Sequence, residues 1–338
     1  KIYLIGNNME LRKVNINKEL NSWNEVIINS PDFYTIAHNP SVITFIDNTL
    51  GWKGDSFFIV KQAKIIGIYQ HSYPTEGKSV SIPHFSYGGI IRSDKTFTKT
   101  EIFESIKEFL PNSFEIREFE PYTNYFNDDK IATYLELQAT IEDQLAIFKY
   151  NHRRKIKKAY KNALEVIISN KKESMLLFYE VYSRNMLRLG SPPLSKHFFI
   201  NLLKEYKFGE LKIFLVKLNG KVIGGAVVLS YHNFIEDCWL STLNKYNHLY
   251  TSILLYWEMI KYAIEKDKKY FSFGRSTKDS SLLHFKKQWK PIEKQLYFSY
   301  SEPQKVSLKK MTFLTRIWKL LPLKVANFVG PKIADKLY

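Results

Sequence analysis

The order of predicted helices and strands constrains the fold most, because one order occurs twice along the chain. Each half reads as two helices, an antiparallel pair of strands, a further helix and a closing strand. Hydrophobic residues make up 45% of the 338 residues, which is enough to bury a core in both halves. The pattern predicts an α/β protein with two tandem domains, each a mixed, mainly antiparallel sheet flanked by helices.

The predicted elements divide the chain into a first domain at 1–140, a second domain at 141–302 and a tail at 303–338. In the first domain we expect helices at 18–29, 41–50 and 99–110, and strands at 56–62, 64–71, 113–118 and 132–137. In the second domain we expect helices at 141–163, 173–189, 195–206 and 249–266, and strands at 164–169, 211–218, 221–231, 234–240, 270–273 and 292–300. Gly190 and the Asn219-Gly220 pair mark a helix end and a hairpin turn.

The chain carries a formal net charge of +17, which raises the local concentration of polyanions around the protein. RNA, anionic lipid head groups and phosphorylated donors all fit this charge, which does not choose among them. No apolar run reaches the roughly 20 residues that span a bilayer, and the first residues lack the features of a signal peptide. With a single cysteine, Cys238, these observations predict a cytoplasmic protein.

The segment 141–163 is the most basic predicted helix, and an apolar stripe at 156, 159, 160 and 163 predicts that one of its faces packs. Its cations fall between positions 149 and 161: Lys149, Arg153, Arg154, Lys155, Lys157, Lys158 and Lys161. Two interpretations stay open. The helix is a solvated connector between the domains, or it binds a nucleic acid or a phosphorylated substrate.

A stretch near the end of the second domain groups positive and hydroxyl side chains around one strand end. We expect the strand to break at Gly274, where the chain can turn sharply, and to present Arg275 and Ser276. A short helix carrying Lys286 and Lys287 follows. Such a group is suited to binding phosphate or carboxylate. The alternative is a solvated helix face, with the arginine capping a helix or pairing with an acidic neighbour.

Two further segments carry functional hypotheses. The run 79–92 holds a proline and two adjacent glycines, which favour a strand leading into a loop with Ser81, His84 and Tyr87 at its rim, or an edge strand with a bulge. The tail 303–338 mixes apolar and basic side chains and has one acidic residue. This pattern is typical of an interfacial helix on an anionic membrane, and packing onto the first domain is the alternative.

Three motifs, in order along the chain, resemble those of the FemA/FemB-like proteins of the GNAT acyltransferase superfamily, especially the branch found with exopolysaccharide loci. They read SIPHFSYGGI, FYEVYSRNMLRLGSPPLSKHFFINLL and FSFGRSTKDSSLLHFKKQW. The likeness covers roughly residues 55 to 300, and the tail is also similar to the ends of these proteins. It implies two GNAT-like domains that transfer an acyl or aminoacyl group to an amine of a cell-envelope precursor, which is phosphorylated, sugar-nucleotide or lipid-linked.

The same resemblance implies roles for two residues. Arg188 in RLG matches a position that contacts substrate phosphate, and Lys286 in HFKKQW matches one that contacts phosphate or the reacting carbonyl. Both roles suit the side chains, because a guanidinium grips phosphate with two parallel hydrogen bonds and an ammonium stabilises a developing oxyanion.

The acyl donor stays open between acyl-CoA, acyl-carrier protein and aminoacyl-tRNA. The turn before the 249–266 helix, LNKYNHLYTSILLYW, lacks the glycines with which GNAT enzymes cradle the pyrophosphate of acyl-CoA. The helix could instead offer backbone amides at Tyr250, Thr251 and Ser252. The helical arms that some Fem proteins insert after position 189 are absent, which disfavours tRNA. No metal site is expected, because no histidine lies at ligand spacing from another histidine or a carboxylate.

The strand FIEDCWLS holds the candidate general base for such a transfer. One of Glu236 and Asp237 should face the cleft, and we favour Asp237, which shares its side of the strand with Ile235 and Trp239. An exposed Glu236 with a hydrogen-bonded structural Asp237 is the alternative. The rival to an enzyme is a non-catalytic protein that uses a degenerate acyltransferase fold to bind RNA or anionic membrane.

Overall fold

In a computed structural model, which describes residues 2–5, 9–304 and 315–336, the chain folds into two units and crosses between them three times. The first unit holds 1–131 and 294–304, and the second holds 132–293 and 305–338. The first two crossings lie within strands: β8 (Phe126–Glu136) on the way out and β14 (Ile292–Tyr300) on the way back. The sequence placed the returning strand in the second domain. Its residues from 294 onward lie in the first unit because β14 pairs with β7 (Ser113–Glu118).

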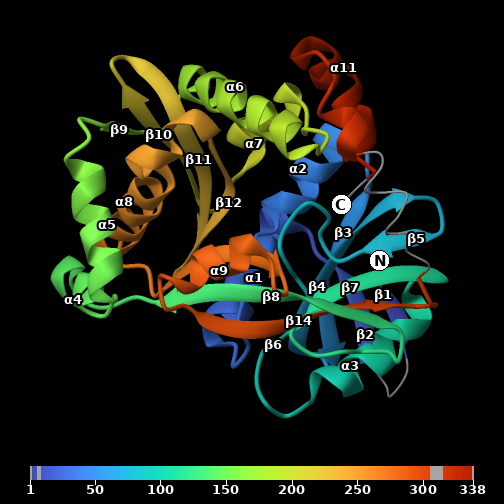
Figure 1. The fold of residues 1–338 in the computed structure, drawn as a ribbon. Coiled ribbons are helices and arrows are strands. Elements are labelled where there is room, and N and C mark those ends of the chain that lie inside the picture. The colour runs from blue at the N-terminus through green and yellow to red at the C-terminus, as the bar shows by residue number, and fades with distance from the viewer. Residues whose placement is uncertain (1, 6–8, 305–314, 337–338) are drawn as a thin grey trace. The chain divides into compact units, whose positions relative to one another are not determined.

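The first unit is built on a sheet that is antiparallel except at one pair of strands (Figure 1). The strand order is β1-β2-β3-β4-β5-β7-β14, and β5 and β7 run parallel. The remaining strands are β1 (Ile2–Ile5), β2 (Met9–Lys13), β3 (Gly54–Lys61), β4 (Lys64–Thr75), β5 (Lys78–Val80) and β6 (Ile91–Arg92), which pairs with β4. The sequence analysis missed β1 and β2, because short and partly charged runs such as MELRK carry little periodicity.

Helices cover both faces of this sheet. They are α1 (Ile16–Asn29), α2 (Ser41–Leu50) and α3 (Lys99–Ile106), with short 3₁₀ turns at η2 (Ile36–His38) and η3 (Lys107–Phe109). Adjacent phenylalanines on β3 show the two faces: Phe58 packs against Trp23 of α1 at 6.0 Å, and Phe57 packs against Phe109 at 5.3 Å between ring centroids. Because neighbouring strand residues point to opposite faces, both faces are buried.

The loop after β5 is not arranged as predicted. Ser81 and Tyr87, which were expected at a loop rim, lie in the core of the first unit, and only His84 is partly exposed among the three. The Tyr87 ring packs against Phe119 at 4.9 Å, and the Ser81 hydroxyl accepts from the Arg117 amide at 2.9 Å. The glycines explain this burial. A Cβ at Gly89 would lie 2.2 Å from a carboxylate oxygen of Glu118, so only glycine lets the loop pack this closely.

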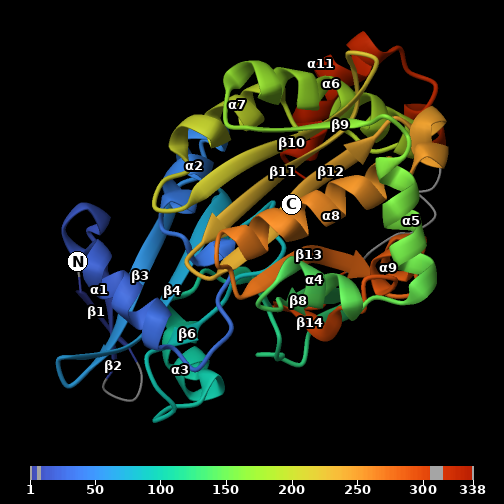
Figure 2. The same cartoon turned by 90° about the vertical axis from the view of Figure 1, so that its left-hand side faces the viewer.

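The second unit is a sheet in the order β13-β12-β11-β10-β9, joined at β13 by the end of β8 (Figures 1 and 2). Its strands are β9 (Glu165–Ser169), β10 (Glu210–Leu218), β11 (Lys221–Tyr231), β12 (Phe234–Thr242) and β13 (Tyr270–Thr277). The predicted hairpin turn is confirmed, since Asn219 and Gly220 both adopt positive φ, of 48° and 77°. Strands β12 and β13 are parallel, and the others in this unit pair antiparallel.

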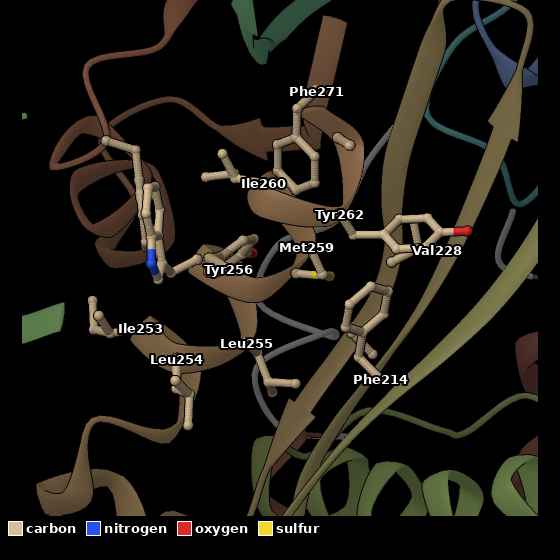
Figure 3. Packing of buried hydrophobic residues seen from close by; sticks show 14 of the residues in the cluster. Phe214, Val228, Ile253, Leu254, Leu255, Tyr256, Met259, Ile260, Tyr262 and Phe271 are labelled. Atoms are coloured by element: carbon tan, nitrogen blue, oxygen red, sulfur yellow. The ribbon is translucent and has the colours of Figure 1, made fainter. Parts of the chain in front are cut away.

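Two helix layers enclose this sheet. Helices α6 (Lys172–Leu189) and α7 (Lys196–Glu205) lie on one face, and α8 (Thr251–Glu265) with α5 (Tyr150–Tyr160) lies on the other (Figure 2). Figure 3 shows how α8 fills the core: Tyr262 packs against Phe214 of β10, beside Met259 and Ile260. The shorter elements are α4 (Ile141–Ala146), η4 (Asn244–Leu249), α9 (Ser281–Lys287) and α11 (Leu323–Ala334).

The basic segment is two helices rather than the single helix predicted for 141–163. The chain turns between α4 and α5 because Phe148 is buried there, with its ring 5.4 Å from Trp289 and 6.0 Å from Trp257. Arg153 then closes the first helix by donating to the Ala146 carbonyl at 3.1 Å. The predicted packing of this helix is confirmed at Ile156 and Ala159, while Tyr160 is exposed.

The described part of the tail packs within the second unit. Helix α11 lies against α6, as Figure 1 shows, with Ala326 and Gly330 buried. A Cβ at Gly330 would lie 2.5 Å from the Pro193 ring, so the two segments touch closely. The start of the predicted tail, at 305–314, lies outside the described residues.

Gly209 gives a stability prediction for the second unit. A Cβ there would lie 2.0 Å from the main-chain oxygen of Ser230, which cannot swing aside as a side chain could. We therefore expect Gly209→Ala to lower the free energy of unfolding by about 1–3 kcal/mol in urea titrations. The control is Gly220→Asn in an exposed hairpin turn, where asparagine tolerates the left-handed backbone and nothing lies within 4 Å. Equal stability of Gly209→Ala and wild type would contradict this reading.

Candidate functional site

A β-bulge in β12 determines which side chains face which helix layer. Trp239 pairs with Val227 and Asp237 with Val228, so Cys238 is an extra residue on β12. Asp237 therefore points to the α8 side, while the Trp239 ring packs against Phe199 of α7 at 5.4 Å. The prediction that Asp237 and Trp239 share one side is wrong, because the bulge reverses the alternation between them.

The strands β12 and β13 pair over three residues and then separate. The pairs run from Phe234 with Tyr270 to Glu236 with Ser272, whereas β12 continues for six residues and β13 for five beyond that point. The sequence predicted that the second strand would break at Gly274. Instead β13 continues through Gly274, which adopts a φ of 69° that favours glycine. We call the region beyond Glu236 and Ser272 the β12–β13 fork.

Lys286 places a buried ammonium in this fork. Its side chain comes from α9 and is 3% exposed. The Nζ donates to the carbonyl of Phe273 at 2.5 Å and to that of Arg275 at 3.2 Å, both on β13. Since an ammonium has three N–H donors, one remains for another acceptor. The α9 helix is held by a Ser280 cap, whose hydroxyl accepts from the Leu283 amide at 3.2 Å.

Two carboxyl groups of β12 accompany the ammonium, and both are buried. Glu236 is 1% exposed and accepts from the Ser272 hydroxyl at 2.8 Å, and Asp237 is 7% exposed. The alternative that Glu236 is exposed is therefore wrong. Helices cover both faces of this sheet, so two neighbouring strand residues are both inside.

Burial and charge at the fork move the pKa values of Asp237 and Lys286 toward neutral pH. Burial raises the pKa of Asp237 to about 7, an effect that the Lys286 ammonium opposes. Burial lowers the pKa of Lys286 to about 8, and the carboxylates of Asp237 and Glu236 oppose that change. Opposed shifts of this kind suit one group to accept a proton and the other to carry positive charge.

Tyr256 is a site residue that the sequence analysis missed. Its hydroxyl hydrogen-bonds the Asp237 carboxyl, and burial raises its pKa well above the usual value. The sequence offered a signal only of packing, since Tyr256 lies on the apolar face of the α8 helix that Figure 3 shows. Its ring also packs against Phe273 and Trp289, at 5.1 and 5.8 Å.

Three buried polar atoms near α9 have no hydrogen-bond partner within residues 9–304. They are Asp237 Oδ1, Ser276 Oγ and Trp289 Nε1. An unpaired polar atom away from water is costly, so such atoms mark a place where a ligand or water belongs. Ser276 was predicted as a binding residue, and its hydroxyl is available for that role.

The remaining predicted residues near Lys286 are arranged differently. Lys287 points outward and forms an ion pair with Glu293 at 3.0 Å, with both side chains well exposed. Arg275 is half-buried on β13 and binds Lys286 through its carbonyl. The predicted grip by adjacent lysines is therefore wrong, because neighbours on a helix point about 100° apart.

The start of α8 fits the predicted donor contacts only in part. Tyr250 adopts a φ of 61°, and its amide donates to the Asn247 carbonyl at 3.0 Å. The prediction that this amide is free to bind a ligand is therefore wrong. Thr251 is fully buried and its hydroxyl donates to the Tyr246 carbonyl at 3.2 Å. Ser252 lies next along the first turn and is partly exposed.

Arg188 lines a hollow of about 590 Å³ at the C-terminal half of α6, which we call the first hollow. The hollow is bounded by α6, the β10–β11 hairpin and the chain after β12. Its charged lining residues are Glu180, Arg184, Arg188, Lys217, Lys221 and Lys245. Asn185 holds Arg188 in place, accepting from its Nη2 at 2.9 Å and donating to the Ser241 hydroxyl on β12 at 3.2 Å.

The predicted site is thus divided. Lys286, Asp237 and Ser276 gather at the fork, Arg188 lines the first hollow, and Tyr87 lies in the core of the first unit. Lys286 and Asp237 do not line the first hollow. Within the described part of the chain, no three histidine, cysteine or carboxylate side chains form a group that could hold a metal ion. No described helix is both long enough and apolar enough to cross a membrane.

Comparison with known proteins supports the fold of the second unit. Residues 147–287, which contain α6 to α9 and the fork, match the family model described as acetyltransferase (GNAT) domain. This part of the second unit is therefore similar to a GNAT acetyltransferase domain. A search of curated proteins by sequence found no match.

Three solved structures resemble most of the chain. FemX has a TM-score of 0.64 at 14% identity, covering 85% of this chain and 96% of its own. The C-terminal domain of a lysylphosphatidylglycerol synthetase from Agrobacterium fabrum has a TM-score of 0.55 at 7% identity, covering 88% and 94%. A tandem GNAT protein from the clavulanic acid biosynthesis pathway has a TM-score of 0.53 at 8% identity, covering 88% of this chain and 100% of its own. These likenesses confirm the predicted fold of tandem GNAT-like domains.

Proposed function

We propose that the second unit transfers an acyl or aminoacyl group from an activated carbonyl to an amine, with the reaction at the β12–β13 fork. The observation that carries this proposal is the buried pair of Lys286 and Asp237, which sits where the two strands separate in a GNAT domain. Both groups titrate close to neutral pH, which suits proton transfer at that pH.

The proposed reaction assigns each group one task. The Asp237 carboxylate accepts the proton that the attacking amine releases, and the amine nitrogen forms a bond to the donor carbonyl carbon. The third N–H of Lys286 stabilises the negative oxygen that forms in this step. Tyr256 holds the carboxyl of Asp237 by a hydrogen bond and is a positioning residue. When the oxyanion collapses, the bond to the donor sulfur or oxygen breaks, and that atom leaves with the proton that Asp237 had accepted.

We further propose that the acceptor is an anionic precursor of the cell envelope, bound through Arg188. The motifs that resemble FemA/FemB-like proteins and the structural likeness to FemX support this class of acceptor. The likeness to the lysylphosphatidylglycerol synthetase domain supports a lipid-linked acceptor, and a charged tRNA is one of three candidate donors. Acyl-CoA and acyl-carrier protein are the other donors, and the glycine-poor turn before α8 disfavours the first of these.

The test offers the purified protein the three donors side by side with a panel of amino-sugar nucleotides. Mass spectrometry then detects an acylated amine and the released donor. We expect transfer from one donor class, and none above background with Lys286→Ala. Absence of transfer from all three donors, with anion binding retained, would instead favour the non-catalytic binding protein.

A variant at Arg188 tests acceptor binding. We expect Arg188→Ala to raise KM for a phosphorylated acceptor about 10- to 100-fold with little change in kcat. The reason is that the substrate complex and the transition state both lose the same charge-assisted hydrogen bond. Steady-state kinetics at several acceptor concentrations measures this change. Lys172→Ala, an exposed change at the other end of α6, is the control. An unchanged KM in Arg188→Ala would remove Arg188 from the proposal.

A further inference from the structure

The first hollow continues toward the tail through two shared residues. A second hollow of about 450 Å³ lies between α6, the start of α7 and α11. Glu180 and Arg184 of α6 line both hollows, so the two are adjacent on one helix face. The second hollow is also lined by Lys196 of α7 and by Lys324 and Phe328 of α11.

The charge of these joined hollows is strongly one-sided. Seven lysines and arginines line them, five in the first hollow and two more in the second, against the single carboxylate of Glu180. None of the seven has an ion pair with a carboxylate among the described residues. Like charges held this close repel one another, and an anion bound between them would relieve the repulsion. The surface is therefore complementary to phosphate.

Helix α11 adds an apolar face beside the charge. Its small residues face the protein, with Ala326 and Gly330 buried and Gly330 against Pro193. The opposite side presents Phe328, which is 72% exposed, next to Val325 and Val329. Leu320, just before the helix, is 84% exposed. Close docking by small residues leaves the large apolar side chains outside, where a water-facing helix would carry polar ones.

Exposed cations flank this apolar face. They are Arg316, Lys319, Lys324, Lys332 and Lys336. The Lys332 ammonium lies 5.2 Å from the centre of the Phe328 ring, which keeps its charge beside the apolar surface. Beside the Phe328 ring, the aliphatic side chains of Leu320, Val325 and Val329 offer RNA bases no surface for stacking, whereas they do insert among acyl chains. An anionic lipid surface satisfies both the apolar face and the cations.

We propose that the α6–α11 surface of the second unit binds the phosphate head group of an anionic membrane lipid, with α11 lying in the membrane interface. The phosphate enters the second hollow between Lys196 and Lys324, and Phe328 inserts beside the acyl chains. This binding goes beyond the proposed transfer and does not depend on it. It places the first hollow, with Arg184 and Arg188, next to the membrane surface.

The test measures flotation of the full chain with two kinds of vesicle, at about 0.1 M salt. One kind is pure phosphatidylcholine, and the other contains about 30 mol% phosphatidylglycerol in phosphatidylcholine. We expect binding to the anionic vesicles only. Phe328→Asp should weaken it about tenfold or more, because the side chain no longer partitions into the interface. Ile28→Asp changes another exposed apolar residue, 64% exposed on α1, and should leave binding within twofold.

A charge comparison locates the head-group site. The double variant Lys196→Gln with Lys324→Gln should weaken vesicle binding about tenfold or more, since each lysine near an anionic surface contributes about fivefold. The matched control, Lys157→Gln with Lys158→Gln, removes the same charge from an exposed part of α5 and should change binding less than twofold. Circular dichroism checks that each variant is folded.

Three outcomes would overturn the proposal. Equal binding to both vesicle types is one, and an equal loss in the two double variants is another, because net charge alone would then explain binding. The third is an RNA oligonucleotide that binds through Lys196 and Lys324 while anionic vesicles do not bind. Acyl transfer is measured separately with the amino-sugar acceptors. Loss of vesicle binding therefore leaves the proposed reaction intact, and loss of transfer leaves the lipid site intact.

Discussion

Replacing Lys286 by alanine should lower kcat for acyl transfer about 10²- to 10³-fold. The ammonium is buried at the fork, and two of its N–H groups are taken by main-chain carbonyls of β13. In the low-dielectric surroundings of the site, its charge stabilises a developing oxyanion far more than it would in water. The measurement is kcat under saturating donor and acceptor, with mass spectrometry of the acylated product.

Two further variants separate catalysis from folding. Lys286→Met keeps most of the side-chain volume but removes the charge. It should therefore lose activity like the alanine variant, while filling the space of the lysine side chain better than alanine does. Lys287→Ala removes the neighbouring exposed lysine and its ion pair with Glu293, and should stay within twofold of wild type. A folded Lys286→Met protein with wild-type kcat would remove Lys286 from the reaction.

Replacing Asp237 by asparagine should lower kcat/KM about 10²- to 10⁴-fold and change its pH dependence. The base must be ionised, so activity in the wild type should rise as pH passes the Asp237 pKa of about 7. Lys286 must be protonated, so activity should fall as pH passes its pKa of about 8. The profile of kcat/KM against pH is therefore expected to be a narrow bell between these values.

The shape of that profile in the variant decides whether Asp237 is the base. Asparagine cannot ionise, so the rise near pH 7 should be absent from Asp237→Asn while some fall at higher pH remains. A rise near pH 7 that persists in the variant would assign the base to another group or to the substrate. Tyr256→Phe serves as a comparison, since it removes one hydrogen bond to the carboxyl and should shift the rise to higher pH.

Most elements could be predicted because their signals are local. The α8 helix follows from apolar residues at helical spacing, and the β10–β11 hairpin follows from Asn219 and Gly220. The strands that were not predicted have weak local signals. The first two strands are short and the second is charged, and β8 begins with FNDDK, whose polar side chains hide a strand that is defined by its neighbours.

The candidate site was predictable in its residue types but not in its arrangement. Both Lys286 and Asp237 followed from the sequence, the first through its resemblance to a family motif and the second as an acid on a strand. Tyr256 was hidden because a buried tyrosine on an apolar face reads as packing. Its partnership with Asp237 depends on the bulge at Cys238, and a bulge leaves no mark in the periodicity of a single strand.

By itself, the amino-acid sequence determined the class of the fold and its two-part order, and it singled out an acid and a lysine as candidate site residues. Tertiary structure alone decided that Lys286 turns inward while Lys287 turns outward, and that Asp237 faces α8. The physical reason is the range of the interactions. Helices and strands follow from neighbours along the chain, whereas the burial and pKa of a side chain depend on strands and helices distant in sequence.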